Sequence, residues 1–365
     1  MSDATSFRVD PDVRRAGTLP GRFYADAATF EAVRERVFAR SWQLVADAAE
    51  VDGPGRALPV TFLPGHVDEP LLLVRDRDGT LRALSNACTH RAALLCETPG
   101  VLPHLRCRYH GRRFGLDGRF LSAPGFEGAE GFPRPEDDLA RVPVGSLGRL
   151  LFAALDPGVP LDGLLAPLRS RCGHLPWGEA AFDASRSRDY LVNASWALYC
   201  DNYLEGFHVP FVHPALAPAL DLDAYRTELF EWSSLQLGVA AREGEAFDLP
   251  AGHPDEGTLV AGWYWWLWPG TMLNVYPWGV SVNLVQPLAP DRTRVRFLSY
   301  VWDASRLEKG AGSGLHAVEM EDESVVESVQ KGVAARLYPG GRFSPSGEAG
   351  VHHFHRLLAR ELGGR

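Results

Sequence analysis

Residues 86–111 pair a cysteine with a histidine twice within a short span. The first pair lies in Asn86-Ala-Cys88-Thr-His90-Arg-Ala, and the second, after sixteen further residues, lies in Cys107-Arg-Tyr-His110-Gly. A thiolate and an imidazole separated by one or two residues on a tight loop can turn toward one site, so two such loops supply four ligands. The alternative, scattered core residues, does not account for two pairs at ligand spacing, and the pattern therefore indicates a metal centre.

The choice of metal rests on how the ligands are mixed. A set of two cysteines and two histidines also suits structural zinc, whose ligand pairs commonly combine like with like. Here each loop carries one thiolate and one imidazole. This arrangement resembles the Rieske signature, in which two cysteines hold one iron of a [2Fe–2S] cluster and two histidines hold the other. The resemblance makes Cys88, His90, Cys107 and His110 the expected cluster ligands.

The other three cysteines have no partner at ligand spacing. Cys96, Cys172 and Cys200 are isolated, and we expect them to be small buried hydrophobic residues. Five cysteines is an odd and low number, which argues against a secreted disulfide scaffold and for a reducing, cytoplasmic location.

Composition places the chain among ordinary globular proteins. It has 365 residues, 45% of them hydrophobic, which suggests two or three domains. Its formal charge of −9 argues against nucleic acid and anionic lipid as partners. No stretch approaches the ~20 apolar residues of a membrane span, and Phe7-Arg8-Val9-Asp10 is not a signal-peptide core. Enzymes and binding proteins remain.

The pattern of apolar residues and turn signals changes along the chain and predicts three segments. Apolar residues Phe30, Val33, Val37 and Phe38 recur at helical spacing within residues 26–40. Short β-like runs, 70–75 and 145–155 among them, follow up to a Pro- and Gly-rich boundary near residues 156–160. We therefore expect an N-terminal helical segment (1–41), a small antiparallel domain (42–156) and a larger domain of mixed α and β structure (157–365).

The region after the boundary mixes both element types. Residues 194–207 are expected to form a helix, and 262–268 and 280–284 are expected to form strands. A long helix is predicted for residues 316–337, with an apolar side made of Met320, Val325, Val326, Val329 and Val333.

A second constellation lies in Asp201-Asn-Tyr-Leu-Glu205-Gly-Phe-His208-Val-Pro-Phe-Val-His213-Pro. On a regular helix, residues five apart diverge by roughly 140°, but Pro210 interrupts the helical pattern and makes convergence of the two histidines possible. The alternative is a pair of packed helical histidines. Two histidines and one carboxylate form the facial triad that holds Fe(II) with open positions for oxygen. The acidic run at residues 321–327 offers candidates for the carboxylate, although such a run can also be a solvated helix face.

Taken together, both constellations make the chain resemble the oxygenase component (α subunit) of the Rieske non-haem iron oxygenases, also called ring-hydroxylating oxygenases. The resemblance implies an α+β fold. An antiparallel-β Rieske [2Fe–2S] domain precedes a helix-grip-type catalytic domain, in which an antiparallel sheet and helices hold a mononuclear iron. Residues 276–288, 321–332 and 350–355 look closest to the choline and glycine-betaine monooxygenase branch.

The resemblance also assigns roles by position. His208 and His213 match the iron-binding histidines, and Asp322 is preferred over Glu321 and Glu323 as the third ligand because it stands five before Glu327. Glu205 occupies the place of an acid that bridges a Rieske histidine of one subunit and an iron histidine of its neighbour, where many relatives have the shorter Asp. Asn202 is an expected polar neighbour of the iron. One departure is Arg112, because relatives often have tryptophan after the His-Gly of the second cluster pair.

The implied function is a terminal oxygenase. Electrons from NAD(P)H would arrive through a ferredoxin or flavin reductase, pass to the cluster and then to Fe(II), and O₂ would be used to hydroxylate a small organic substrate. A methylated ammonium compound is the leading candidate, with hydroxylation or N-demethylation as the outcome. Dihydroxylation of an aromatic ring, a Rieske electron carrier and a zinc-stabilised binding protein are the alternatives. The family suggests a homotrimer, without a β subunit in the choline-like branch.

Three further groups of residues have two interpretations each. The aromatic run 263–268 either faces a pocket that suits a quaternary ammonium or a flat ring, or supplies core tryptophans. His352, His353 and His355 are expected to be packing or surface residues, not ligands. The arginines of the cluster loop are assigned to subunit or reductase docking and not to nucleic acid: Arg106, Arg108, Arg112 and Arg113.

Overall fold

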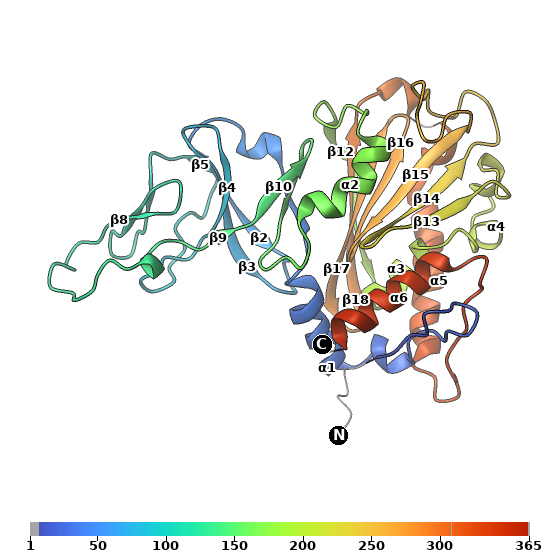
Figure 1. Ribbon diagram of the computed structural model, residues 1–365, viewed down its shortest axis with the longest axis horizontal. Coiled ribbons are helices and arrows are strands. Elements are labelled where there is room, and N and C mark those ends of the chain that lie inside the picture. The colour runs from blue at the N-terminus through green and yellow to red at the C-terminus, as the bar shows by residue number, and fades with distance from the viewer. Residues whose placement is uncertain (1–6, 308, 364–365) are drawn as a thin grey trace. The chain divides into compact units, whose positions relative to one another are not determined.

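The computed structural model describes residues 7–307 and 309–363 (Figure 1). The chain divides into two compact units, one of residues 39–159 and the other of the residues before 39 together with those from 160 onward. The first boundary follows the N-terminal helical segment, and the second falls within the Pro-rich stretch near residue 160. The N-terminal helical segment is thus part of the same unit as the C-terminal half.

The unit of residues 39–159 is built from three small antiparallel sheets with strand orders β1-β11-β10, β5-β2-β3-β4-β9 and β6-β7-β8. The cluster motif occupies the loops between β4 and β7. The run 145–155 is not one strand but the hairpin β10–β11, because Gly148 turns the chain with φ at 55°. The strands are β1 (Gln43–Asp47), β2 (Arg56–Phe62), β3 (Glu69–Arg75), β4 (Leu81–Ser85), β5 (Gly100–Val101), β6 (Leu105–Arg106), β7 (Arg113–Phe114), β8 (Phe120–Ser122), β9 (Arg141–Val142), β10 (Val144–Leu147) and β11 (Leu150–Ala153).

The other unit contains a seven-stranded antiparallel sheet with the order β12-β18-β17-β16-β15-β14-β13. Strands β13 to β18 follow one another in the chain and form a meander. Strand β12, the first in the chain, pairs with β18 at one edge of this open sheet. Its strands are β12 (Ala181–Val192), β13 (Arg226–Leu229), β14 (Ser233–Val239), β15 (Val260–Leu267), β16 (Thr271–Tyr276), β17 (Gly279–Ala289) and β18 (Arg292–Val301).

Helices cover this sheet and carry the candidate site. Helix α3 contacts strand β17 and also helices α5 and α6, and Figure 1 shows the three helices gathered along the sheet. The helices are α1 (Ala27–Val33), continued by a π-helical turn (Arg34–Phe38), α2 (Leu161–Cys172), α3 (Trp196–Tyr203), α4 (Val209–Val212), α5 (Leu315–Val333) and α6 (Ala349–Leu362). Antiparallel sheets with helices confirm the expected α+β class.

Helix α5 forms where the sequence predicts it, but the predicted apolar side is only partly correct: Val326 is buried, Val325 and Val333 are half-buried, and Met320 and Val329 are exposed. Met320 and Val329 are 47% and 41% exposed, whereas Glu319 and Val326 are its buried residues. The helix therefore turns part of its acidic run toward the protein interior. A charged residue pays a high desolvation cost unless it has partners, so this orientation points to a polar site on that side.

Two other expectations concern burial and membrane spans. Cys96, Cys172 and Cys200 are buried free thiols, which confirms the prediction made for them. Within the described part of the chain, no helix combines the length and the apolar character that a membrane crossing requires.

Candidate active site and cluster loops

The two cysteine–histidine loops have the same local design. In the first, Cys88 N donates to Ala93 O and Ala92 N donates to Cys88 O, both at 2.9 Å. In the second, Cys107 N donates to Arg112 O at 2.8 Å and Gly111 N donates to Cys107 O at 3.0 Å. These bonds close each loop into a turn around its cysteine, and Gly111, at φ 74°, supplies the left-handed residue that the second turn needs.

The loops bring like ligands together. Cys88 and Cys107 are buried and their thiols are in hydrogen-bond contact, while the rings of the half-buried His90 and the exposed His110 lie 4.7 Å apart. A two-iron cluster held by cysteines at its inner iron and histidines at its outer iron requires this separation of thiols from imidazoles. The donor set therefore fits a Rieske cluster better than a single tetrahedral ion.

The environment of the thiols differs between the two loops. Burial raises the pKa of the Cys88 thiol. Burial also acts to raise the pKa of Cys107, but hydrogen bonds from the backbone N–H groups of Tyr109 and His110 outweigh it, so that this pKa lies below its usual value. Thiolates are the form that binds iron, and these backbone donors stabilise that form.

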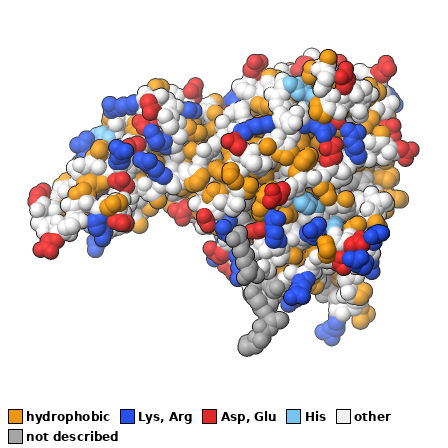
Figure 2. Space-filling view, in the orientation of Figure 1, with side chains coloured by type: hydrophobic (Ala, Val, Ile, Leu, Met, Phe, Trp, Pro, Cys, Tyr) orange, Lys and Arg blue, Asp and Glu red, His pale blue; other side chains and the backbone are white. Residues whose placement is uncertain are grey.

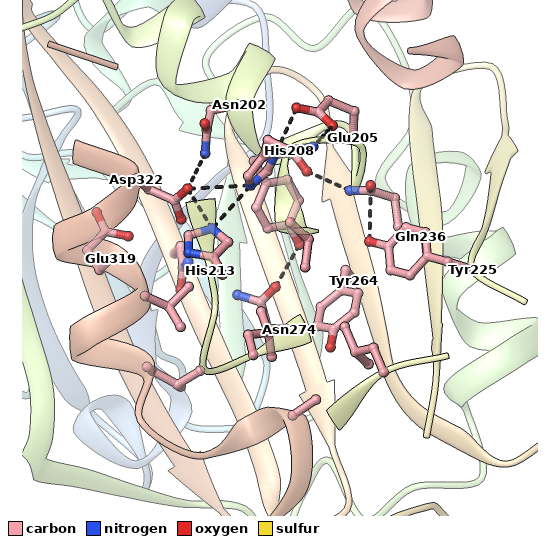
Figure 3. Close-up of a pocket in the computed structure, with 18 of the residues that line it drawn as sticks. Asn202, Glu205, His208, His213, Tyr225, Gln236, Tyr264, Asn274, Glu319 and Asp322 are labelled. Carbon is pink, nitrogen blue, oxygen red and sulfur yellow. Dashed lines mark hydrogen bonds and ion pairs between the residues drawn. The ribbon is translucent and has the colours of Figure 1, made fainter. Parts of the chain in front are cut away.

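In the other unit, His208, His213 and Asp322 converge (Figure 3). The two Nε2 atoms are 3.2 Å apart, and Asp322 Oδ1 lies 3.0 Å from His213 Nε2 and 3.5 Å from His208 Nε2. Asp322, rather than Glu321 or Glu323, is the carboxylate that faces both imidazoles. Two histidines and one carboxylate whose ligand atoms all lie within 4.8 Å of one another are suited to Fe(II) with open coordination positions.

The backbone explains why histidines five apart can meet. Helix α3 ends at Tyr203, earlier than the expected residue 207, and α4 is a single turn that contains Pro210. His208 and His213 are the two caps of α4, and His213 leaves the helical region with φ −115° and ψ 73°. The expected break at Pro210 is wrong, because Pro210 lies inside the turn, at a position near the helix start where no N–H group is needed. The two histidines converge because they flank this short turn and His213 leaves the helical conformation, so the alternative of two packed helical histidines does not hold.

Each histidine is oriented through its second ring nitrogen. Glu205 Oε1 lies 2.7 Å from His208 Nδ1, and its Oε2 accepts a hydrogen bond from His208 N at 3.0 Å. Glu321 Oε2 lies 2.7 Å from His213 Nδ1. Carboxylates in this position fix the ring and its tautomer, which leaves Nε2 for a metal. Asn202 Nδ2 donates to Asp322 Oδ1 at 2.7 Å, so the expected polar neighbour contacts the carboxylate of the triad.

These contacts shift the pKa values of the triad residues when no metal is bound. Burial lowers the pKa of His208, but its hydrogen bonds with Asp322 and Glu205 outweigh burial and raise that pKa to about 9. Burial raises the pKa of Asp322, yet the two histidines bring it down to about 2. A metal would replace the proton shared among these groups. Iron bound there would supply the redox chemistry with O₂, while the chain's residues hold and orient it.

Beside the triad lies a cavity of about 120 Å³ whose wall is rich in tyrosine (Figure 3). Tyr203 OH donates to Asn274 Oδ1 at 2.8 Å, and Tyr225 OH donates to Gln236 Oε1 at 3.1 Å. Because neighbouring side chains bind the hydroxyl groups of Tyr203 and Tyr225, the rings of these two tyrosines contribute aromatic surface to the cavity wall. The aromatic and carboxylate side chains that line the cavity are Tyr199, Tyr203, Tyr225, Tyr264, Tyr276, Phe297, Glu205, Glu319 and Asp322.

The aromatic run 263–268 divides between core and cavity. Trp263, Trp265 and Trp266 are fully buried core residues, with Trp263 Nε1 donating to Asp255 Oδ2 at 3.0 Å. Tyr264 alone of this run lines the cavity. The core interpretation of the tryptophans is therefore confirmed, and a single residue of the run supports the pocket interpretation.

Sequence reasoning missed Glu319. It is 3% exposed, its Oε2 accepts a hydrogen bond from Tyr199 OH at 2.8 Å, and its Oε1 has no partner among the described residues. Burial raises its pKa well above the usual value. The signal that could have found it is its place one helical turn before Asp322, on the same face of α5.

The remaining predictions have mixed outcomes. His355 is fully buried and bonds Asp201 Oδ1 at 2.9 Å, and His352 bonds Asp10 O at 2.8 Å, so these histidines pack as expected. Figure 2 shows basic side chains on the surface of the unit of residues 39–159, and Arg106, Arg108 and Arg113 are exposed there. Arg112 is only 3% exposed, so its assignment to docking is wrong.

Comparisons with known proteins agree with both centres. Residues 41–133 match the Rieske [2Fe–2S] domain, and residues 179–364 match the catalytic domain of the ring-hydroxylating α subunit. Choline monooxygenase of Arabidopsis thaliana is 30% identical over 98% of this chain and 86% of its own length. The carnitine monooxygenase oxygenase subunit of Escherichia coli K12 is 31% identical over 95% of this chain and 94% of its own length.

Solved structures show the same fold. The quaternary ammonium Rieske monooxygenase CntA in complex with L-carnitine superposes with a TM-score of 0.72 at 26% identity, covering 96% of this chain and 97% of that one. Naphthalene 1,2-dioxygenase from Rhodococcus has a TM-score of 0.70 at 18% identity, with 95% and 94% coverage, and shares the fold.

Members of this family carry a Rieske [2Fe–2S] cluster and a mononuclear iron, and their electrons typically come from NAD(P)H through a reductase. The ligand loops, the triad and the matches over both domains agree. The chain belongs to the Rieske non-haem iron oxygenases and is a terminal oxygenase component of that family.

Proposed function

We propose that this oxygenase hydroxylates or demethylates a small quaternary or methylated ammonium compound. The observation that carries the proposal is Glu319, a buried carboxylate with an unpartnered oxygen in a tyrosine-walled cavity beside the triad. Aromatic faces attract a quaternary ammonium, which has no N–H group to donate. Similarity to choline and carnitine monooxygenases supports the same substrate class.

The carboxyl group of Glu319 gives the cavity a preference for a cationic ligand over a neutral one. Burial without a counter-charge disfavours the ionised form of Glu319 and raises its pKa well above the usual value. A fixed positive charge in the cavity would favour the ionised form, so the protein gains an ion pair only with a cationic ligand. A flat hydrocarbon could use the tyrosine rings but would leave this carboxyl group in apolar surroundings.

A substrate comparison tests the proposal. Trimethylammonium alcohols and acids are compared with neutral isosteres in which carbon replaces nitrogen, and with naphthalene, by O₂ uptake coupled to product formation. We expect turnover of the ammonium compounds, and a KM at least about tenfold higher in Glu319→Gln, because this variant keeps the shape and removes the charge. Turnover of naphthalene, with none of the ammonium compounds, would establish ring dihydroxylation instead.

The proposed ligand roles follow from the contacts described above. Cys88, His90, Cys107 and His110 hold the cluster, and His208, His213 and Asp322 hold the iron. Glu205 and Asn202 act on the iron site, Glu205 by orienting His208 and Asn202 by holding Asp322. Both Glu205 oxygens contact His208, Oε1 at Nδ1 and Oε2 at the backbone N–H, so a bridge to a histidine of a neighbouring subunit would use the second lone pair of one of these oxygens.

The proposed assembly is a homotrimer in the cytoplasm, reduced by a ferredoxin or flavin reductase. The exposed His110 gives the cluster an edge from which electrons can enter or leave, and Arg106, Arg108 and Arg113 form a basic surface near it. Such a surface favours an acidic electron-transfer partner. The free cysteines favour a reducing compartment.

A further inference from the structure

Arg112 places a guanidinium inside the cluster domain. It follows Gly111 in the second ligand loop, its own carbonyl accepts the hydrogen bond from Cys107 N, and its side chain is 3% exposed. Arginine is rarely buried to this degree without a specific set of partners. The partners of Arg112 are therefore informative.

The side chain connects the second ligand loop to the first. Arg112 Nη1 donates to Thr89 Oγ1 at 2.9 Å, and Thr89 stands between the ligands Cys88 and His90. Thr89 Oγ1 in turn donates to Asp137 O at 2.8 Å. One guanidinium thus spans both loops that hold the proposed cluster ligands.

Arg112 also forms a buried ion pair. Its Nη1 lies 3.0 Å from Asp137 Oδ1, and the two side chains are 3% and 7% exposed. Asp137 Oδ2 accepts a further hydrogen bond from Arg134 N at 2.9 Å, which fixes the carboxylate. The Nε atom of Arg112 has no partner among the described residues.

Three phenylalanine rings enclose the guanidinium. Its Cζ lies 5.1 Å from the ring centroids of Phe126 and Phe132 and 5.4 Å from that of Phe120. Phe126 also contacts the ring of His90 edge-on at 5.2 Å. The enclosure keeps water away from the charge and joins it to a proposed cluster ligand, so the field of Arg112 is weakly screened there.

We propose that Arg112 is a positioning residue for the [2Fe–2S] cluster, which locks the two ligand loops together and, in balance with Asp137, sets the cluster's reduction potential. A buried ion pair is weak as a source of stability, because desolvation offsets its attraction, and an apolar side chain would fill the phenylalanine enclosure at lower cost. Its contacts with the ligand loops give it a different role. A positive charge at this place favours the reduced, more negative cluster.

The test measures the midpoint potential of the cluster in the full-length protein by spectroelectrochemical titration. Arg112→Met removes the positive charge and is expected to lower the potential, whereas Asp137→Asn removes the negative charge and is expected to raise it. The double variant is expected to lie between the two. Arg113→Met is the matched control, since it removes one charge from the next, exposed residue and is expected to leave the potential nearly unchanged.

Cluster retention provides a second readout of loop locking. Arg112→Lys keeps the charge but loses the planar donor fork, so its potential is expected to stay near that of the wild type. Its cluster is expected to be lost to a chelator about tenfold faster. Unchanged potentials in both Arg112→Met and Asp137→Asn, or shifts of both in one direction, would overturn the proposal. If Arg112→Met holds no cluster, the upward shift in Asp137→Asn and the preserved potential in Arg112→Lys decide the question.

Discussion

Asp322 contacts both histidines of the proposed iron site. Its Oδ1 faces the two Nε2 atoms and accepts a hydrogen bond from Asn202, while Glu321 beside it contacts only the far nitrogen of His213. Adjacent acids on one helix thus differ in role because they leave the helix about 100° apart. The sequence presents both Glu321 and Asp322 as candidates, and the directions in which their side chains leave α5 distinguish them.

Replacing Asp322 by Ala is expected to remove the mononuclear iron and keep the cluster. Two imidazoles alone hold Fe(II) weakly, and the proposed cluster ligands belong to the other unit. Metal analysis should fall from about three to about two irons per chain with an unchanged Rieske spectrum. Met320→Ala, at an exposed position of the same helix, is the control and should retain all the iron. Full iron content in Asp322→Ala would contradict the assigned ligand.

The pKa of His208 predicts how the metal-free protein responds to pH. Its folded-state pKa of about 9 lies above the unfolded value near 6.5, so its interactions stabilise the fold fully below pH 6.5 and are lost as pH rises through 9. Iron must displace this proton, so iron affinity is expected to rise across the same interval.

Two measurements check this behaviour. Urea unfolding of the metal-free protein should lose about 3 kcal/mol between pH 6.5 and 9, and His208→Gln should lose most of this dependence. Competition with a chelator should show tighter iron binding at pH 8 than at pH 6.5. Iron affinity that is flat or falls over this interval would show that His208 does not hold the proton.

At the scale of elements, the proposed iron site is built by two short helices, α3 and α4, and one long helix, α5. Helix α3 ends at Tyr203 and α4 has a single turn around Pro210, which delivers the histidines, while α5 delivers Asp322 and Glu319. The Asp–Glu spacing made Asp322 predictable, whereas the end of α3 at Tyr203 and the helical turn through Pro210 differ from the expected helix to residue 207 and the expected break. The buried side of α5 could not be predicted, because its apolar residues lie on more than one side of the helix and its residues Glu319 and Asp322 line the cavity.

A buried network around Asp255 joins α2, β13 and β15, and its loss is expected to destabilise the catalytic unit. Asp255 is 1% exposed and accepts hydrogen bonds from Arg171 at 2.7 Å, Arg226 at 2.7 Å and Trp263 at 3.0 Å. Among the described residues, Asp255→Ala leaves Glu228 as the remaining ion-pair partner of the largely buried Arg171 side chain. The free energy of unfolding should fall by about 3 kcal/mol.

Urea unfolding monitored by tryptophan fluorescence measures this change, since Trp263 is part of the network. Glu243→Ala removes an exposed carboxylate outside this network and should stay within about 0.5 kcal/mol of the wild type. A similar loss in both variants would mean that net charge, rather than the network, determines the effect.

At the scale of the whole molecule, the proposed cluster ligands and the proposed iron ligands lie in different compact units of the chain. The proposed trimer makes a clear prediction for mixed assemblies. A chain with Cys88→Ser and Cys107→Ser lacks the cluster, and a chain with Asp322→Ala lacks the iron, so each alone should be inactive. Assembled together, they should regain part of the activity if electrons cross between subunits.

Co-expression with two affinity tags isolates the mixed assemblies, and substrate turnover by them measures the recovery. Assemblies of Asp322→Ala with Met320→Ala, which retain complete subunits, serve as the control for assembly itself. Mixed assemblies that are proven by both tags yet inactive would show that electrons stay within one chain.

The sequence by itself determined the family and the candidate ligands of both metal centres, because these are grouped in short motifs: Cys88 with His90, Cys107 with His110, and His208 with His213. Local spacing restricts where such side chains can point, and the motif is therefore readable without the fold. Only the tertiary structure decided what surrounds them. Glu319 and the tyrosine wall come from segments far apart in the chain, and Arg112 is enclosed by a loop (residues 120–132) that folds back over it. Burial of a polar group becomes visible only when such segments pack together.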